Sequence, residues 1–271
     1  MPPLSKLRAF PNRDICGVGV CRISESEFIS YVTSRAFDLT YSKSEISEPP
    51  MFITYLNAAC SNIAATDTEY NRILAESDIV YADGQAIVWA AQSLGERLPG
   101  RVNAGDFIID FCRVLTERGI SIGLVGGRPG VALRAAEVWR QQVPGLRVSG
   151  TWSGFFGEDE AEVIARIRRS NARVLLVGMG VPLQEKWAWH HRDELGVKVI
   201  WCVGALFEYY GEGRARAPVW MRKAGLEWLF RLVLEPRRLW RRYLIGNWRF
   251  LWRVKTYRRR GADKGTPRPG D

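Results

Sequence analysis

The chain has 271 residues, of which 46% are hydrophobic, and it carries a formal net charge of +10. This hydrophobic content excludes an intrinsically disordered chain, and the length suffices for one large domain or for a domain with an appendage. No run approaches the roughly 18 apolar residues that a membrane-spanning helix needs. The N-terminus has no apolar segment typical of a secretory signal, so we expect a cytoplasmic protein.

The positive charge is concentrated at one end of the chain. From Arg214 to Asp271 there are 17 Lys and Arg residues against 4 Asp and Glu residues, which leaves 22 basic and 25 acidic residues in the rest. Apolar and aromatic residues alternate with arginines in residues 216–243. A basic, Trp-rich segment on a near-neutral body indicates a polyanionic partner: a membrane surface, a nucleic acid or a phosphorylated substrate.

Metal sites and disulfide bonds are not indicated. The five cysteines form no CxxC pair, and we interpret them as reduced thiols. His190 and His191 are the two histidines, and because they are adjacent they cannot face one metal ion together. The sequence also lacks a GxSxG nucleophile elbow and a P-loop. We therefore expect no metal and no cofactor.

Short apolar runs alternate along the chain with amphipathic segments. Apolar runs that predict strands are residues 16–20, 51–56, 77–83, 121–127, 147–152, 172–180 and 197–205. Helical spacing is found in residues 24–36, 58–75, 84–95, 104–118, 129–142, 158–170 and 183–194. This alternation predicts an α/β fold of the Rossmann-like kind, with a mostly parallel sheet and helices on both faces.

The pattern changes after Gly204. Large apolar residues recur there at three- and four-residue spacing with arginines between them, namely Leu239, Trp240, Tyr243, Leu244, Trp248, Leu251 and Trp252. This predicts a C-terminal, basic, amphipathic helical appendage. We expect an α/β body over residues 15–205, a membrane-associating appendage over residues 206–260, and flexible termini at residues 1–14 and 261–271.

Two polar residues stand at the carboxyl ends of predicted strands, where ligands bind in open parallel sheets. Asp83 precedes a glycine that opens a helix. A carboxylate there can take the proton of a hydroxyl as a general base, or it can cap the following helix. The amide of Asn57 can likewise fix a hydroxyl group or satisfy a local turn.

Two glycine-rich turns lead from strands into helices. Backbone N–H groups at Gly126 and Gly127 could hold a phosphate, although no acidic residue follows at the spacing that a dinucleotide ribose requires. This argues against a dehydrogenase. In the turn that begins at residue 178, we expect Gln184 and Glu185 to be exposed near the start of the helix. Either turn could instead serve only to reverse the chain.

Eight segments in register resemble the WecG/TagA/CpsF glycosyltransferases (glycosyltransferase family 26), from about Ile15 to Tyr243. They are TYLNA at 54–58, the ADG turn with Asp83, Arg101-Val102 with Asp106, LVGGRPGV at 124–131, PGLRVSGTWSGFF at 144–156, VGMGVPLQEKW at 177–187, VGALFEYYGEGRARAP at 203–218 and LEWLFRLVLEPRRLWRRY at 226–243.

The resemblance implies an inverting, metal-independent enzyme at the inner face of the cell membrane. Such an enzyme moves a sugar from a nucleotide-sugar donor, usually a UDP-sugar, onto a polyprenyl-diphosphate-linked sugar in cell-surface polysaccharide or exopolysaccharide synthesis. Asp83 is then the catalytic base. The implied substrate-binding residues of the body are Asn57, Tyr55, Arg101, Gly126, Gly127 and Gln184.

Three appendage arginines complete the expected substrate site. Arg231, Arg238 and Arg241 are spaced by seven and three residues, which places them on one helical face unless Pro236 bends the helix. They either face the membrane or reach a diphosphate, for which arginine offers bidentate hydrogen bonds. Arg231 is the preferred candidate for the second role because it lies nearest the body in sequence.

The chain departs from the family pattern at two places in the expected sugar pocket. Tyr55 stands where the family often has threonine, and Asn103-Ala104 replaces Thr-Gly. Both a glucose-type and an N-acetylmannosamine-type donor therefore remain open, as does the oligomeric state, including a homo-oligomer. A nucleic-acid-binding protein would explain the basic segment but not Asp83 at a strand end. An inert membrane scaffold is the other alternative.

Overall fold

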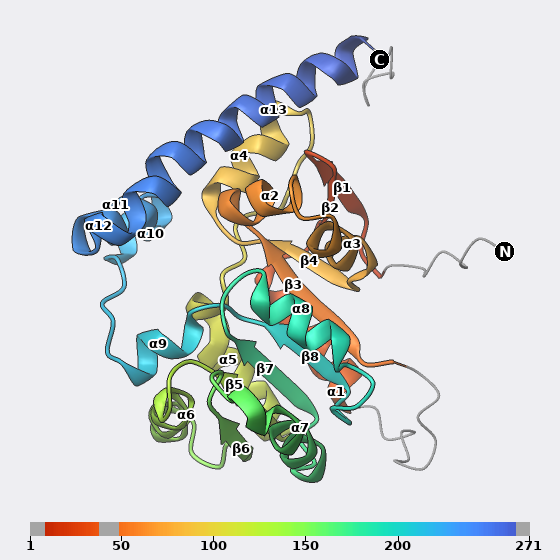
Figure 1. The fold of residues 1–271 in the computed structure, drawn as a ribbon, viewed down its shortest axis with the longest axis vertical. Coiled ribbons are helices and arrows are strands. Elements are labelled where there is room, and N and C mark those ends of the chain that lie inside the picture. The colour runs from red at the N-terminus through yellow and green to blue at the C-terminus, as the bar shows by residue number, and fades with distance from the viewer. Residues whose placement is uncertain (1–8, 38–48, 264–271) are drawn as a thin grey trace, which may run out of the picture.

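The computed structural model describes residues 9–37 and 49–263. Of the flexible ends expected at residues 1–14 and 261–271, residues 1–8 and 264–271 lie outside this part. Six parallel strands form one sheet in the order β4-β3-β8-β7-β5-β6 (Figure 1). They are β3 (Met51–Leu56), β4 (Ile79–Ala82), β5 (Ile122–Gly126), β6 (Val148–Trp152), β7 (Val174–Gly178) and β8 (Val199–Cys202). The predicted Rossmann-like α/β fold is confirmed.

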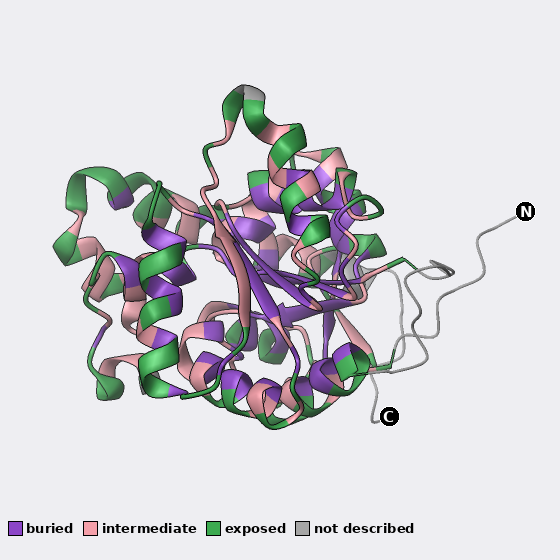
Figure 2. Ribbon diagram, turned by 90° about the horizontal axis from the view of Figure 1, so that it is seen from below, coloured by how far each residue is buried: buried purple, intermediate pink, exposed green. Residues whose placement is uncertain are grey.

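Successive strand residues point to opposite faces of the sheet, and both faces are apolar. In β8, Trp201 packs with Phe28, Phe107 and Phe111 on one face, whereas Ile200 belongs to the cluster on the other. All residues of β3, β4, β5, β7 and β8 are accordingly buried, whereas those of β6 are partly exposed (Figure 2). Helices therefore cover both faces, as the apolar strand pattern predicts.

The helices follow the predicted segments closely. One group packs in the larger core cluster and contains α1 (Glu25–Phe37), α4 (Gln85–Ser93), α5 (Ala104–Glu117) and α6 (Val131–Gln142). The opposite cluster receives α7 (Glu160–Arg169), which follows the short η1 (Gly157–Asp159), and α8 (Leu183–His190). A further helix, α9 (Leu206–Gly211), follows β8 and packs on α6.

Two predicted elements differ from the structure. The strand expected at residues 16–20 is the turn and second strand of an antiparallel hairpin, β1 (Asn12–Ile15) and β2 (Val18–Cys21), because Cys16 and Gly17 adopt positive φ angles of 56° and 87°. The helix expected over residues 58–75 is two helices, α2 (Ala58–Ala64) and α3 (Thr68–Glu76). Asp67 starts the second by accepting a hydrogen bond from the Tyr70 N–H, as an N-cap does.

The C-terminal part is helical. It contains α10 (Val219–Lys223), α11 (Glu227–Leu234), α12 (Pro236–Trp240), the π-helical turn η2 (Arg241–Ile245) and α13 (Gly246–Asp263). Among the helices of the described part of the chain, none is long and apolar enough to cross a membrane. The last of them lies along α2 and α4 (Figure 1), and its Phe250 and Val254 join the main core.

Candidate active site

Asp83 and Asn57 meet because they follow adjacent parallel strands in matching register. Leu56 of β3 is paired with Ala82 of β4, so both polar residues emerge at the same carboxyl edge of the sheet. The Asn57 amide Nδ2 lies 3.4 Å from Asp83 Oδ2, and its Oδ1 accepts the Cys60 N–H at 3.0 Å. Asn57 therefore both caps α2 and faces the carboxylate.

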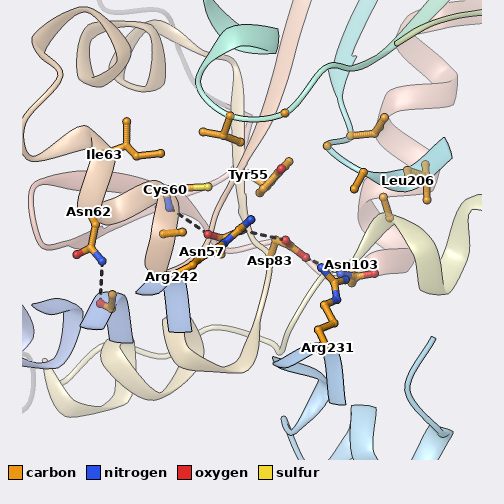
Figure 3. Close-up of a pocket in the computed structure, with 18 of the residues that line it drawn as sticks. Tyr55, Asn57, Cys60, Asn62, Ile63, Asp83, Asn103, Leu206, Arg231 and Arg242 are labelled. Carbon is orange, nitrogen blue, oxygen red and sulfur yellow. Dashed lines mark hydrogen bonds between the residues drawn. The ribbon is translucent and has the colours of Figure 1, made fainter. Parts of the chain in front are cut away.

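The carboxylate of Asp83 has no capping role in the helix that follows it. The N-cap residue of α4 is Gly84, so no side-chain hydrogen bond caps this helix. The hydrogen bonds of the Asp83 oxygens come instead from Asn57 and from Asn103, whose Nδ2 lies 2.6 Å from Oδ1 (Figure 3). The carboxylate is thus held between two amides and aimed into a cavity.

Asn103 is a site residue that sequence reasoning noted only as a departure from the family pattern. Its backbone is extended, and its Oδ1 accepts the Gly105 N–H at 3.1 Å, which caps α5. Just before it, the Val102 N–H donates to the carbonyl of Ala82 at the end of β4. These contacts fix the Asn103 amide beside Asp83, and its place directly before a helix was the signal available in the sequence.

The surroundings of Asp83 have opposing effects on the pKa of its carboxyl group. Burial raises the pKa of this carboxyl above its ordinary value, because desolvation disfavours the charged form. The hydrogen bond from Asn103 and the positive charge of Arg231 lower the pKa again, and Glu227 raises it. A partly buried carboxylate with a raised pKa is a stronger proton acceptor than a solvated one.

A cavity of about 860 Å³ opens over these side chains. Tyr55, Asn57, Asp83 and Asn103 form one side of it, and the loops around Gly180 and Gly204 form another. Arginines from the C-terminal helices close it, namely Arg231, Arg241, Arg242 and Arg249. Figure 3 shows Arg231 and Arg242 approaching the Asn57–Asp83–Asn103 row from the side of the C-terminal helices. The cavity combines one carboxylate with several cations, which suits a phosphate-bearing substrate.

The three arginines expected on one helical face are separated by a helix break. Glu235, with φ −131° and ψ 59°, ends α11 before Pro236 begins α12. Arg231 and Arg241 line the cavity, whereas Arg238 lies outside it and pairs with Glu235. The helix is thus interrupted at Pro236, which is the condition under which the three arginines were not expected to share a face.

The sequence analysis did not predict two of the arginines that line the cavity. Arg242 belongs to the π-helical turn, and Arg249 follows one and a half to two turns later. Their seven-residue spacing was the signal that could have grouped them. A π-helical turn changes which residues share a helix face, and such turns are frequent at functional sites.

Arg101 lies outside the cavity over Asp83, and its guanidinium forms ion pairs with carboxylates. It pairs with Asp106 and, at 3.2 Å, with Glu227 of α11. Arg216 and Arg222 also pair with Asp106. These residues form a partly buried network that ties the C-terminal helices to the start of α5. The guanidinium of Arg101 already has two anionic partners. The diphosphate role expected of Arg101 stays a prediction.

Gln184 and Glu185 are completely buried, so the prediction of exposed side chains is wrong. Glu185 Oε1 accepts hydrogen bonds from Thr54 at 3.0 Å and from Gln184 at 2.7 Å. Gln184 Oε1 accepts the Gly204 N–H at 2.9 Å and so holds a loop that lines the cavity. Burial raises the pKa of Glu185 to about 7, although both hydrogen bonds lower it.

The remaining predicted residues divide between the cavity and its surroundings. Tyr55 lines the cavity, with its hydroxyl so close to Gly204 that a Cβ there would lie 2.4 Å away. Gly126 and Gly127 lie outside it at the end of β5. A Cβ at Gly126 would meet the Gly178 backbone at 2.2 Å, and the Gly127 N–H already donates to Gly178. The two glycines therefore allow the backbone of this turn to approach that of Gly178 closely. In the described residues, no group of three metal-ligating side chains occurs.

Comparisons with known proteins give a matching family model and similar proteins. The model of the glycosyl transferase WecG/TagA/CpsF family matches residues 13–264. The N-acetylglucosaminyldiphosphoundecaprenol N-acetyl-beta-D-mannosaminyltransferase of Bacillus subtilis (strain 168) is 28% identical over 192 residues, which are 71% of this chain and 74% of that protein. The Staphylococcus aureus (strain MRSA252) protein of the same name is 26% identical over 191 residues, 70% and 75% of the two chains.

Proposed function

Because this chain belongs to the WecG/TagA/CpsF family and is a glycosyltransferase, we propose that it moves a sugar from a UDP-sugar onto a polyprenyl-diphosphate-linked sugar, with Asp83 as the catalytic base. The observation that carries the proposal is the carboxylate of Asp83, held by two amides at the floor of an arginine-lined cavity. The relatives, whose names specify a diphosphoundecaprenol-linked acceptor, support it.

The proposed reaction is a single displacement. The carboxylate of Asp83 takes the proton of an acceptor hydroxyl, and the hydroxyl oxygen forms a bond to the anomeric carbon of the donor sugar. The bond between that carbon and the diphosphate oxygen breaks, and the electron pair leaves with UDP. Attack from the side opposite the leaving group inverts the anomeric configuration. The inert membrane scaffold considered from the sequence has no place in an enzyme of this family.

The cavity arginines would stabilise the negative charge that develops on the departing diphosphate. Arg231 is the best placed, because it approaches the Asp83 carboxylate closely enough to influence its pKa. Arg241, Arg242 and Arg249 line the same cavity. Fixed cations aimed at developing charge contribute strongly in a site that excludes water. No metal ion enters this proposal.

The donor sugar is proposed to be of the N-acetylmannosamine or the glucose type. The names of the relatives favour the first. The second is favoured by Tyr55 and Asn103, which change the wall and floor of the cavity where the family usually carries threonine. A tyrosine ring and an asparagine amide present a different shape and different donors to the sugar than two threonine hydroxyls.

A peripheral position at the inner face of the cell membrane completes the proposal. Large apolar side chains of the C-terminal helices are exposed, among them Trp220 at 66%, Val233 at 72% and Trp252 at 60%. Arginines and lysines share these helices. Exposed tryptophans with basic residues favour the interface of an anionic membrane, where a lipid-linked acceptor resides.

A panel of UDP-sugars tests this function. The protein is incubated with each donor and a lipid-diphosphate monosaccharide, and the products are identified by mass spectrometry. We expect one donor to add a single hexose or N-acetylhexosamine unit with release of UDP, and the new linkage to have the inverted anomeric configuration. Retention of configuration, or transfer to no acceptor from any donor, would contradict the proposal.

A further inference from the structure

A second cavity, of about 650 Å³, meets the first one at Asp83. It lies between α4 and the C-terminal elements α11, η2 and α13. The residues that line both cavities are those of the catalytic row, one alanine and two arginines, namely Asn57, Ala59, Asp83, Asn103, Arg231 and Arg242. The carboxylate of Asp83 is therefore accessible from two directions.

The walls of this second cavity, called here the α4–α13 groove, are mostly apolar and aromatic away from Asp83. The lining residues that carry this character are Trp89 and Ala90 of α4, Trp228 of α11, and Trp248, Leu251 and Val254 of α13. Several are also open to solvent, since Trp89 is 51% exposed, Trp248 70% and Leu251 59%. Exposed apolar surface of this kind, next to a polar site, indicates a binding groove.

The polarity of the α4–α13 groove changes along its length. At the end shared with the first cavity lie Asp83 and the guanidinium groups of Arg231 and Arg242. Trp89 and Trp248 also line the groove, and both are exposed to solvent. A molecule with a sugar, then a diphosphate, then a hydrocarbon chain has the same order of polarity. Each cavity is lined by four arginines, but two of those in the groove, Arg101 and Arg222, are paired with Asp106. The first cavity therefore suits the nucleotide diphosphate of a donor.

We infer that the α4–α13 groove binds the isoprenoid units of the acceptor nearest its diphosphate, an inference that rests on the proposed function. The acceptor diphosphate then pairs with Arg242, and the terminal sugar of the acceptor places a hydroxyl at Asp83 opposite the donor, whose diphosphate Arg231 contacts. This arrangement explains why two cavities share one carboxylate, because a displacement requires donor and acceptor on opposite sides of the transferred carbon. Contact between the hydrocarbon and the tryptophans provides the binding energy.

Three single substitutions on one helix separate tail binding from membrane contact. Trp248→Asp and Leu251→Asp place a charge in the groove, whereas Trp252→Asp changes a neighbour that lies outside the groove and is similarly exposed, at 60%. Transfer is measured in detergent with two acceptors that share the diphosphate sugar and differ in the tail, one polyprenyl and one a short alkyl chain. None of the three residues belongs to the proposed catalytic machinery.

We expect Trp248→Asp and Leu251→Asp to raise KM for the polyprenyl acceptor about tenfold or more, as the loss of one buried apolar contact predicts. Trp252→Asp should leave that KM within about twofold, and all three should leave KM for the short-tailed acceptor unchanged. Equal increases in all three variants would show contact with the micelle only and would overturn the inference. An unchanged KM in the two groove variants would also overturn it.

A binding measurement distinguishes failure of the inference from failure of the proposed function. Wild-type protein that transfers no sugar refutes the function, and the groove is then probed with a photoreactive geranylgeranyl diphosphate. We expect labelled peptides from residues 85–93 and 243–254, with labelling lost in Trp248→Asp and kept in Trp252→Asp. Labelling confined to other parts of the chain, or identical labelling in both variants, would refute the groove as an isoprenoid site.

Discussion

The amide Nδ2 of Asn103 lies 2.6 Å from Oδ1 of Asp83, although 20 positions separate the two residues in the chain. Asn103 can make this contact because the preceding residue, Val102, donates its N–H to Ala82 at the end of β4, and because the side-chain Oδ1 of Asn103 caps α5. One side chain thus starts a helix and orients the proposed base. The contact also stabilises the charged form of Asp83, in opposition to burial.

Asn103→Thr should move the acidic limb of the pH profile of kcat/KM to higher pH. Threonine still caps α5, but it has no amide to donate to Asp83, so the pKa of the carboxyl rises further. The base must be ionised, so activity is present above this pKa and is lost as the pH falls through it. We expect a shift of about one pH unit. An unmoved limb, or one at lower pH, would refute the role of this hydrogen bond.

Arg231 and Arg238 provide a matched pair in the C-terminal helices. Arg231 lines both cavities, pairs with Glu227 at 2.8 Å and lies over the ring of Tyr209, whereas Arg238 is exposed and pairs with Glu235. Arg231→Ala should lower transfer by about 100-fold on an acceptor dissolved in detergent, because it removes a cation from the leaving diphosphate. Arg238→Ala should leave it within about twofold.

Vesicle binding is the control for this pair. Each substitution removes one positive charge, so each should weaken binding to anionic vesicles by no more than about 1 kcal/mol. Equal losses of transfer in the two variants, matched by equal losses of vesicle binding, would show that Arg231 acts only at the membrane.

Glu185→Gln should reduce the pH dependence of stability. The pKa of Glu185 is about 7 in the folded protein, against 4.5 for a solvated glutamate such as that of the unfolded chain. The native state therefore binds the proton more tightly, and its contribution is complete below about pH 4.5 and lost as the pH rises through about 7. The difference corresponds to about 3 kcal/mol. Urea unfolding at about pH 5 and pH 8 should show a larger fall for the wild type than for the variant; equal falls would contradict this.

Truncation after Gly211 should leave a folded but inactive body. The six-stranded sheet and the contact between α9 and α6 lie entirely before this point. All four cavity arginines lie after it. We propose on this basis that residues 15–205 form a separable unit, and we expect a cooperative thermal transition at a lower temperature, because Phe250 and Val254 are lost from the core. A truncated protein without a cooperative transition would show that the C-terminal helices are part of the folding unit.

The sheet was predictable because its strands are short apolar runs between helical segments, and buried parallel strands require that pattern. The position of Asp83 and Asn57 at one edge of the sheet was predictable because each directly follows such a strand. The hairpin was not, since Cys16 adopts a conformation that a residue other than glycine rarely takes. The burial of Glu185 was also hidden, because its partner Thr54 is 131 positions away and buried ionisable side chains are rare.

The arginines show a different limit of sequence reasoning. Helical spacing grouped Arg231 with Arg238, but the break at Glu235 and the π-helical turn replace that group with Arg231, Arg241 and Arg242. Such irregularities depend on how the C-terminal helices pack on α2 and α4, which periodicity alone does not encode. The ion pair of Arg101 with Glu227, 126 positions apart, is a tertiary contact of the same kind.

The transfer rate of Asp83→Asn, measured with the donor that the UDP-sugar panel identifies, tests the central claim most directly. Asparagine keeps the shape of the side chain but cannot accept the acceptor proton, so turnover should fall by about 100-fold or more. The thermal transition should stay cooperative, which shows that the fold is intact. Transfer at a rate near that of the wild type, by a variant with a cooperative transition, would contradict the assignment of Asp83 as the base.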